Sequence, residues 1–216
     1  MINTILWDFD GTLLNTNDVI LESWQHTYEH YYNRRMPIEH ITKCFGEPLL
    51  VTMAREFPDV PPKDSAEVYR EFQKDIAYVW AKAIPGVFEL VERLKGEGYK
   101  QCIVTSRTTE STLRYLELFD KGHLFDGLVT CDDTDKHKPG PEPILLALDK
   151  MGCEKEEALM VGDGVFDIKC ANNAGVKSVL VGWRITGSGS EVIKDAVQDY
   201  EAETPEELLE IIKSIK

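Results

Sequence analysis

Side chains that can carry chemistry stand at or shortly after the ends of four apolar runs in this 216-residue sequence. They are four carboxylates, two hydroxyls and one ammonium group, on Asp8, Asp10, Thr105, Ser106, Lys138, Asp163 and Asp167. Ligands of open parallel sheets bind at the carboxyl ends of the strands, so these groups are expected to meet at one edge. Carboxylates gathered there repel one another unless a hard cation lies among them, and oxygen ligands suit magnesium. The pattern predicts a Mg²⁺ site.

The same edge is expected to hold an anion. Groups suited to phosphoryl oxygens are the N–H groups of one turn, two hydroxyls and an ammonium, on Asp10, Gly11, Thr12, Thr105, Ser106 and Lys138. A carboxylate and a phosphate repel by about 4 kcal/mol per unit-charge pair at about 4 Å and an effective dielectric near 20. A metal and Lys138 would cancel that repulsion. The arrangement therefore permits an aspartyl-phosphate intermediate on Asp8, which water hydrolyses.

The elements that must position these groups follow from hydrophobic periodicity. Strands are predicted at residues 4–8, 101–106, 127–131, 158–163 and 176–182. Helices are predicted between them, at residues 87–95, 110–118, 143–151 and 165–174. Alternating strands and helices imply a parallel sheet with right-handed crossovers and helices on both faces. The expected fold class is α/β, a Rossmann-like doubly wound parallel sheet.

A long stretch between the first strand and Pro85 breaks this alternation and has helical periodicity throughout. One helix is predicted to begin near Asn15, and shorter helices cover residues 38–44 and 49–56. A further helix has four apolar residues on one face, Val68, Phe72, Ile76 and Val79. We expect residues 15–83 to form an inserted α-helical cap domain. Residues 1–14 and 84–216 then form the catalytic core.

Composition limits the partners. Lys plus Arg total 24 and Asp plus Glu 38, a formal net charge of −14, which repels nucleic acid and anionic membrane surfaces. The five cysteines include no CxxC pair. The first residues lack the basic start and the long apolar run of a secretory signal, and every apolar run is too short to span a membrane, so we expect neither feature. We therefore expect a cytoplasmic protein whose partner is a small molecule. Assembly as a monomer or a homodimer stays open.

Four motifs, in this order, resemble those of the haloacid dehalogenase-like hydrolases. They are D-F-D-G-T-L at 8–13, V-T-S at 104–106, H-K-P at 137–139 and V-G-D-G-V-F-D at 161–167. The resemblance covers the whole chain, including the helical insertion after the first strand. Within the family, D-G-T-L-L-N-T-N at 10–17 and F-G-E-P-L at 45–49 are most similar to phosphoglycolate phosphatases and PpaX pyrophosphatases.

The resemblance implies a catalytic role for each polar group. Asp8 would be the nucleophile, and Asp10 would protonate the leaving oxygen and then activate water. Thr105 and the Ser106 backbone would bind the phosphoryl group. Lys138 would steady Asp8 and the developing charge.

The resemblance also implies a metal set. Asp163 would bind Mg²⁺ together with the Asp8 carboxylate and the Asp10 carbonyl. Asp167 would bind it through water, or would orient Lys138 instead.

Further candidates contact the substrate rather than the metal. Arg107 stands beside the phosphate loop and is expected to reach a second anionic group, although solvation at the surface is an equally weighted alternative. Gly46 in the insertion is a candidate for shaping the leaving-group pocket, and a simple interhelical turn is the alternative. His137 is interpreted as a loop residue. Gly164 departs from the family pattern, where a hydroxyl or amide side chain is common.

The expected function is a Mg²⁺-dependent phosphatase that hydrolyses a small phosphate monoester or pyrophosphate. One alternative is a β-phosphoglucomutase-like phosphomutase, which would return the phosphoryl group to a sugar. A second is a catalytically silent protein that binds metal or phosphate and regulates. Both alternatives stay open at the level of the sequence.

Overall fold

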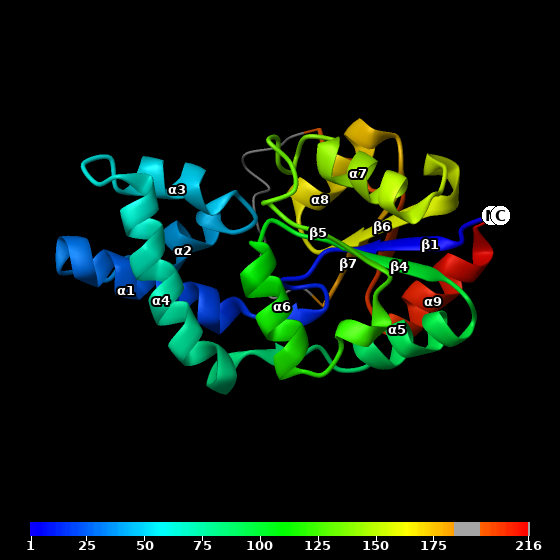
Figure 1. The fold of residues 1–216 in the computed structure, drawn as a ribbon, viewed down its shortest axis with the longest axis horizontal. Coiled ribbons are helices and arrows are strands. Elements are labelled where there is room, and N and C mark those ends of the chain that lie inside the picture. The colour runs from blue at the N-terminus through cyan, green and yellow to red at the C-terminus, as the bar shows by residue number, and fades with distance from the viewer. Residues whose placement is uncertain (184–194, 216) are drawn as a thin grey trace.

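A six-stranded parallel sheet lies at the centre of the computed structural model, which describes residues 1–183 and 195–215 (Figure 1). In spatial order its strands are β5 (Gly127–Val129), β4 (Lys100–Val104), β1 (Thr4–Trp7), β6 (Ala158–Gly162), β7 (Lys177–Val181) and β8 (Tyr200–Ala202). Each neighbouring pair is parallel. The predicted α/β class is confirmed, and β1 lies between β4 and β6, so the ends of these three strands are adjacent.

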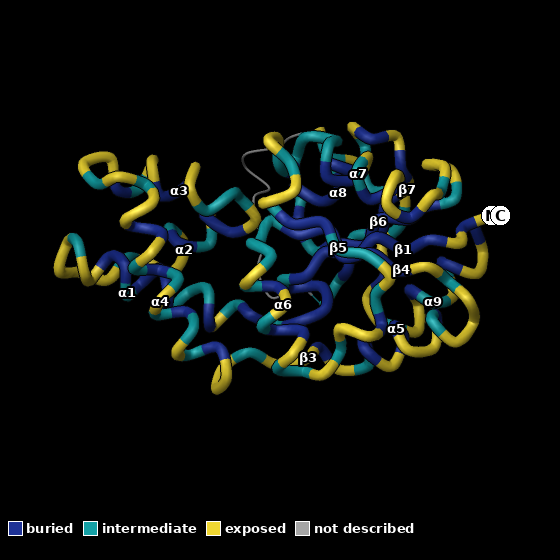
Figure 2. Tube along the Cα trace, viewed as in Figure 1, coloured by how far each residue is buried: buried dark blue, intermediate teal, exposed yellow. Residues whose placement is uncertain are grey.

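The strands have continuous apolar sequences because both faces of the sheet are covered. Side chains alternate between the faces: Ile5 and Trp7 lie in one hydrophobic core, and Leu6 and Met160 lie in the other. All four are fully buried. Figure 2 shows this as dark blue strands enclosed by helices with yellow outer faces.

Helices cover the two faces as the crossover pattern requires. One core contains side chains of α5 (Val87–Gly96), α6 (Thr109–Leu118) and α9 (Pro205–Ser214). The opposite core contains side chains of α7 (Glu142–Met151) and α8 (Val165–Ala174). Figure 1 shows these two helical layers above and below the strands. Short 3₁₀ turns complete the loops, η2 (Gly122–Leu124) and η3 (Lys155–Glu157).

The segment between β1 and α5 forms a second helical body at one side of the sheet (Figure 1). It contains α1 (Asn17–Tyr32), α2 (Ile38–Ile41), η1 (Thr42–Cys44), α3 (Leu49–Glu56) and α4 (Pro62–Trp80). A separate aromatic core holds it together, with the Trp24 ring stacked on Phe57 at 6.5 Å between centroids. The chain leaves and re-enters the core through an antiparallel pair, β2 (Leu14–Asn15) and β3 (Lys82–Ala83).

The expected apolar face of α4 was wrong. The residues that α4 buries are small or polar for the most part: Ser65, Ala66, Tyr69, Gln73 and Ala77. Val79 is 73% exposed, and Phe72 instead stacks on His26 at 4.1 Å. Val68, Phe72 and Ile76 are only half-buried, so the apolar stripe lies at the margin of the buried face of α4.

The short edge strand β8 was also not predicted from the sequence. It has only three residues and pairs with β7 alone. Its neighbours in sequence are acidic, which hides so short an apolar signal. Among the helices of the described residues, none is long and apolar enough to cross a membrane.

Candidate active site

A cavity of about 300 Å³ lies between the carboxyl ends of the central strands and the helical body. From the sheet side it is lined by most of the expected groups: Asp8, Asp10, Thr105, Ser106, Arg107, Lys138, Asp163 and Asp167. From the helical body it is lined by several residues that include Phe45, Gly46 and Glu47. The parallel sheet therefore brings together side chains that lie up to 159 positions apart, from Asp8 to Asp167.

Gly11 and Thr12, which were predicted to contact the phosphoryl group, are not among the residues that line the cavity. Thr12 is fully buried, and its Oγ1 is 3.5 Å from the Asp8 Oδ2 atom. Gly11 has φ +78°, and a Cβ atom there would lie 2.1 Å from the Asp163 Oδ2 atom. Glycine thus allows both the turn after β1 and the close approach of the Asp163 carboxylate.

Lys138 joins two carboxylates at the floor of the cavity. Its Nζ atom donates to Asp8 Oδ1 at 2.8 Å and to Asp167 Oδ1 at 2.6 Å. The second Asp167 oxygen accepts from the backbone N–H of Gly164 at 3.1 Å. Only 3% of the Lys138 side chain is exposed, so this ion pair is shielded from water.

Burial and crowding shift the acidity of these groups. Burial, together with the charge of Asp167, raises the pKa of Asp8 to about 7, although Lys138 opposes the shift. Burial and the nearby charge of Asp8 raise the pKa of Asp163 well above its usual range. Burial alone would lower the pKa of Lys138, but the charges of Asp167 and Asp8 outweigh it and raise that pKa. The floor thus carries more negative charge than its one lysine can balance.

The donor set fits a divalent cation. Asp8, Asp163 and Asp167 each offer one carboxylate oxygen, and these oxygens lie within 4.8 Å of one another. Within the described residues, no hydrogen-bond donor contacts the Asp163 carboxylate. When all three are ionised, three carboxylates facing one ammonium leave an excess of two negative charges, and an all-oxygen set suits magnesium. The Asp10 carboxylate lies outside this cluster.

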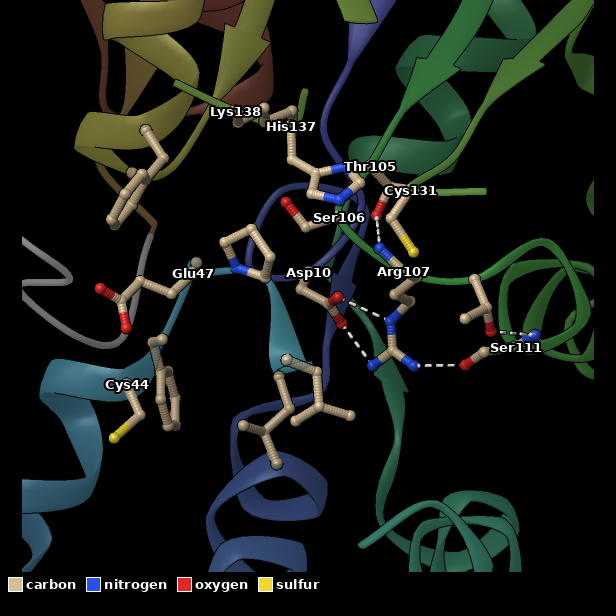
Figure 3. Close-up of a pocket in the computed structure, with 18 of the residues that line it drawn as sticks. Asp10, Cys44, Glu47, Thr105, Ser106, Arg107, Ser111, Cys131, His137 and Lys138 are labelled. Atoms are coloured by element: carbon tan, nitrogen blue, oxygen red, sulfur yellow. Dashed lines mark hydrogen bonds and ion pairs between the residues drawn. The ribbon is translucent and has the colours of Figure 1, made fainter. Parts of the chain in front are cut away.

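Arg107 holds Asp10. Its Nε and Nη2 atoms donate to the two Asp10 carboxylate oxygens, each at 2.6 Å (Figure 3). Thr16 donates to the same carboxylate. The Nη1 atom donates to Ser111 Oγ at 2.8 Å and to Gln73 Oε1 at 3.3 Å. With 8% of its side chain exposed, Arg107 is not the solvated surface residue of the alternative interpretation.

Two polar atoms at the cavity have no hydrogen-bond partner in the described part of the chain. They are His137 Nδ1 and Asn17 Nδ2, and both residues line the cavity. Figure 3 shows the His137 imidazole extending from the loop before Lys138 into the site. The interpretation of His137 as a mere loop residue missed this placement, although its position beside Lys138 was a usable signal.

The helical body approaches the core through Gly46. Its φ is +81°, and a Cβ atom there would lie 3.0 Å from the Phe166 ring of α8. The adjacent Glu47 carboxylate accepts from Arg55 Nη1 at 2.6 Å and from Thr52 Oγ1 at 3.1 Å. The turn therefore both joins two helices and forms part of the cavity wall, so the two interpretations of Gly46 are compatible.

The model of the haloacid dehalogenase-like hydrolase family matches residues 5–181. The chain belongs to this family. The predicted family and enzyme class are thereby confirmed.

Relatives with similar sequences align with almost the whole length of this protein. One from Caldanaerobacter subterraneus is 39% identical over 216 residues, covering 98% of this chain and 95% of its own length. The pyrophosphatase PpaX of Halalkalibacterium halodurans is 36% identical over 211 residues, covering 98% of this chain and 97% of its own. These relatives confirm the prediction of a phosphohydrolase.

Solved structures share the fold. A hydrolase from Pseudomonas syringae superposes with a TM-score of 0.84 at 24% identity, covering 99% of each chain. A haloacid dehalogenase-like family protein from Streptococcus pneumoniae has a TM-score of 0.83 at 24% identity, covering 97% of this chain and 98% of its own. The core and the helical body together therefore follow an arrangement already seen in this family.

Proposed function

We propose that the protein is a Mg²⁺-dependent phosphohydrolase that acts on a small phosphorylated anion, with inorganic pyrophosphate as the favoured substrate. The observation that carries the proposal is the buried Asp8–Lys138–Asp167 contact beside the Asp163 carboxylate, at the floor of the cavity. The PpaX name of relatives that are about 36% identical over nearly the whole chain supports the choice of substrate.

The phosphoryl group would bind against the ends of β1 and β4. Thr105, Ser106 and Lys138 line this part of the cavity, and hydroxyl, backbone N–H and ammonium groups bind phosphoryl oxygens well. Their donors compensate the charge of the bound anion, which the acidic chain would otherwise repel.

Asp8 is the proposed nucleophile. Lys138 fixes one of its oxygens at 2.8 Å and keeps the neighbouring carboxylate of Asp167 oriented. In attack, a bond forms between an Asp8 oxygen and phosphorus while the bond from phosphorus to the leaving oxygen breaks. Water then attacks the acyl phosphate, releases inorganic phosphate and regenerates Asp8. The contacts of Asp167 with Lys138 and with the Gly164 N–H favour its role in orienting Lys138 over binding the metal through water.

Asp10 is the proposed acid and base. It would give a proton to the leaving oxygen in the first step and take one from the attacking water in the second. Its carboxyl group lies in the same cavity as Asp8, which makes both transfers feasible after a side-chain rotation.

Asp8, Asp163 and the Asp10 carbonyl are the proposed magnesium ligands. A magnesium ion bound there would supply positive charge that offsets repulsion between Asp8 and the substrate. The excess of buried carboxylates over ammonium groups at the floor supports this choice of residues.

The helical body, residues 15–83, is the proposed cap. It lies over the cavity and contributes Phe45, Gly46 and Glu47 to the wall. Closure would exclude bulk water during phosphoryl transfer, and reopening would release product. The volume of about 300 Å³ limits the substrate to small molecules.

Phosphate release tests the proposal. The purified protein is supplied with pyrophosphate, phosphoglycolate, glucose 1-phosphate and 4-nitrophenyl phosphate, each with magnesium and with a chelator. Magnesium-dependent release, with the highest kcat/KM for pyrophosphate, is expected. Absence of release from all four contradicts the proposal. Conversion of glucose 1-phosphate to glucose 6-phosphate would identify a mutase instead.

A further inference from the structure

Arg107 presents a two-pronged donor site that Asp10 fills. Its Nε and Nη2 atoms each lie 2.6 Å from a different oxygen of the Asp10 carboxylate. This planar fork matches any group with two oxygens at the right spacing, and phosphoryl groups and carboxylates fit it equally well. Arg107 is therefore a built anion-binding group in a cavity that takes an anionic substrate.

The contact with Arg107 is incompatible with the proposed work of Asp10. Arg107 and Thr16 turn the Asp10 carboxyl group toward the guanidinium, and it lies outside the cluster of Asp8, Asp163 and Asp167. A group that protonates the leaving oxygen must point at that oxygen. Asp10 therefore has to leave Arg107 before the phosphoryl group is transferred.

Arg107 does not depend on Asp10 for its position. The Nη1 atom is held by Ser111 at 2.8 Å and by Gln73 at 3.3 Å. The guanidinium carbon lies 4.5 Å from the centre of the Tyr115 ring, within range of a cation–π contact. Departure of Asp10 would leave a fixed, buried and unpaired positive charge, which is costly unless another anion takes its place.

We propose that Arg107 binds a second anionic group, carried by the leaving group of the substrate, and that this group replaces Asp10 in the fork and frees it for catalysis. The inference rests on the proposed function and extends it. It selects leaving groups that bear a phosphoryl group or a carboxylate. Because Gln73 belongs to α4, the same arginine also connects this exchange to the helical body.

The unmodified enzyme gives the first test. Phosphoglycolate has a carboxylate on its leaving group, whereas 2-hydroxyethyl phosphate has a neutral hydroxyl group of similar size. The charged pair with Arg107 predicts a kcat/KM for phosphoglycolate about 10- to 100-fold higher than for 2-hydroxyethyl phosphate. Equal values for the two substrates would overturn the inference without involving any variant.

Variants give the second test. Arg107→Gln should lower kcat/KM for pyrophosphate and phosphoglycolate by about 10- to 100-fold. It should not lower kcat/KM for 2-hydroxyethyl phosphate, because a neutral leaving group does not use the guanidinium and the variant no longer holds Asp10. Arg107→Lys keeps the charge without the fork and should recover only part of the loss. Arg93→Gln, at an exposed arginine of α5, is the matched control and should leave all values unchanged. Equal losses for charged and neutral leaving groups would show that Arg107 acts only structurally.

Binding separates the exchange from catalysis. Asp10→Asn weakens the competitor for Arg107, so the non-hydrolysable imidodiphosphate should bind about tenfold more tightly, measured by calorimetry with magnesium. Inorganic phosphate has no second anionic group, so its affinity should increase much less in Asp10→Asn. Equal gains for both ligands would overturn the exchange. If the unmodified enzyme releases no phosphate from any substrate, the proposed function fails, whereas these affinities still report on Arg107.

Discussion

At the floor of the cavity, one ammonium group serves two buried carboxylates. Lys138 lies within 2.8 Å of Asp8 and 2.6 Å of Asp167, and all three side chains are at most 11% exposed. Removing the lysine from such a group leaves two buried carboxylates without an opposite charge. Lys138 is therefore expected to stabilise the fold as well as to support catalysis.

Lys138→Met should lower the free energy of unfolding by about 3 to 5 kcal/mol at pH 8, because two carboxylates are left unpaired. Urea unfolding in the presence of a chelator measures this loss. Lys155→Met is the control: Lys155 is 53% exposed and 3.9 Å from Glu156, so its loss should cost less than about 1 kcal/mol. A Lys138 variant as stable as this control would contradict the assignment.

Gly11 and Gly98 offer a matched pair of glycines with positive φ. At Gly11, with φ +78°, a Cβ would meet the Asp163 carboxylate at 2.1 Å. At Gly98, with φ +90°, a Cβ would meet nothing within 4 Å. Alanine at either site should cost about 1 kcal/mol of backbone strain, whereas only Gly11→Ala should also displace Asp163.

Magnesium affinity and phosphate release distinguish the two variants. Gly11→Ala should lose at least about tenfold in magnesium affinity, in line with loss of a well-placed ligand, and should lose activity with it. Gly98→Ala should keep both. Equal behaviour of the two variants would contradict the contact between Gly11 and Asp163.

Residue types at strand ends were enough to predict which side chains meet at the cavity. Asp8, Thr105 and Asp163 follow adjacent parallel strands, so topology alone brings them together. The Arg107–Asp10 contact could not be predicted from the sequence, because it depends on side-chain rotamers and on Gln73 of α4, in the helical body. The sequence shows which charges are present, and packing decides how they pair.

At the scale of elements, a polar cluster joins three helices of the proposed cap. The Glu56 carboxylate at the end of α3 accepts from Tyr28 of α1 at 2.6 Å and lies 2.8 Å from His40 of α2. Arg55 contacts both Glu56 and Glu47, at 2.9 and 2.6 Å. This cluster therefore connects the packing of three helices to a residue of the cavity wall.

Stability of the cap should depend on pH through Glu56. Burial works against the effect, but hydrogen bonds from Tyr28, Arg55 and His40 lower the pKa of Glu56 below its ordinary value of 4.5. Because the pKa of Glu56 is lower in the folded state, Glu56 contributes stability that is fully present above pH 4.5. That contribution is lost as the pH falls through the folded-state pKa. Glu56→Gln should therefore cost about 1 kcal/mol at pH 7 and much less near pH 3.

Chemical unfolding of both proteins at several pH values measures that difference. Glu71→Gln is the control, since Glu71 is 63% exposed and contacts Lys74 within α4. A difference between Glu56→Gln and the unmodified protein that stayed constant from pH 7 to pH 3 would show that the Glu56 charge contributes nothing.

Periodicity predicted elements well where one face is plainly apolar. The expected helices at residues 165–174 and 49–56 coincide with α8 and α3. The apolar stripe of α4 misled because the face that α4 buries carries mostly small and polar residues, with Tyr69 against Trp24 of α1. The edge strand β8 was too short for any periodic signal.

At the scale of the whole molecule, the proposed cap and the core meet over a strongly negative floor in a chain of net charge −14. Without a cation, burial and the charge of Asp167 raise the pKa of Asp8 from 3.8 to about 7. Asp8 therefore contributes stability that is fully present below pH 3.8 and is lost as the pH rises through about 7. Magnesium should reverse that loss, because it requires the ionised carboxylates.

Magnesium should therefore raise the melting temperature more at pH 8 than at pH 6. A concentration 100-fold above Kd gives about 2.7 kcal/mol of stabilisation, and protonated carboxyl groups weaken the binding at the lower pH. Thermal unfolding with magnesium and with a chelator at both pH values measures the effect. An equal shift at the two pH values, or a shift that survives in Asp163→Asn, would contradict the proposed ligand set.

Asp8 is the proposed acceptor of the phosphoryl group. The most direct test is the rate of phosphate release from pyrophosphate, with saturating magnesium, by the unmodified enzyme, Asp8→Asn and the exposed control Asp59→Asn. Asp8→Asn removes the nucleophile with almost no change in volume, so we predict a folded protein with a rate at least about 1,000-fold lower. Asp59→Asn should match the unmodified enzyme. A folded Asp8→Asn protein that retains more than about a tenth of the rate would contradict the account.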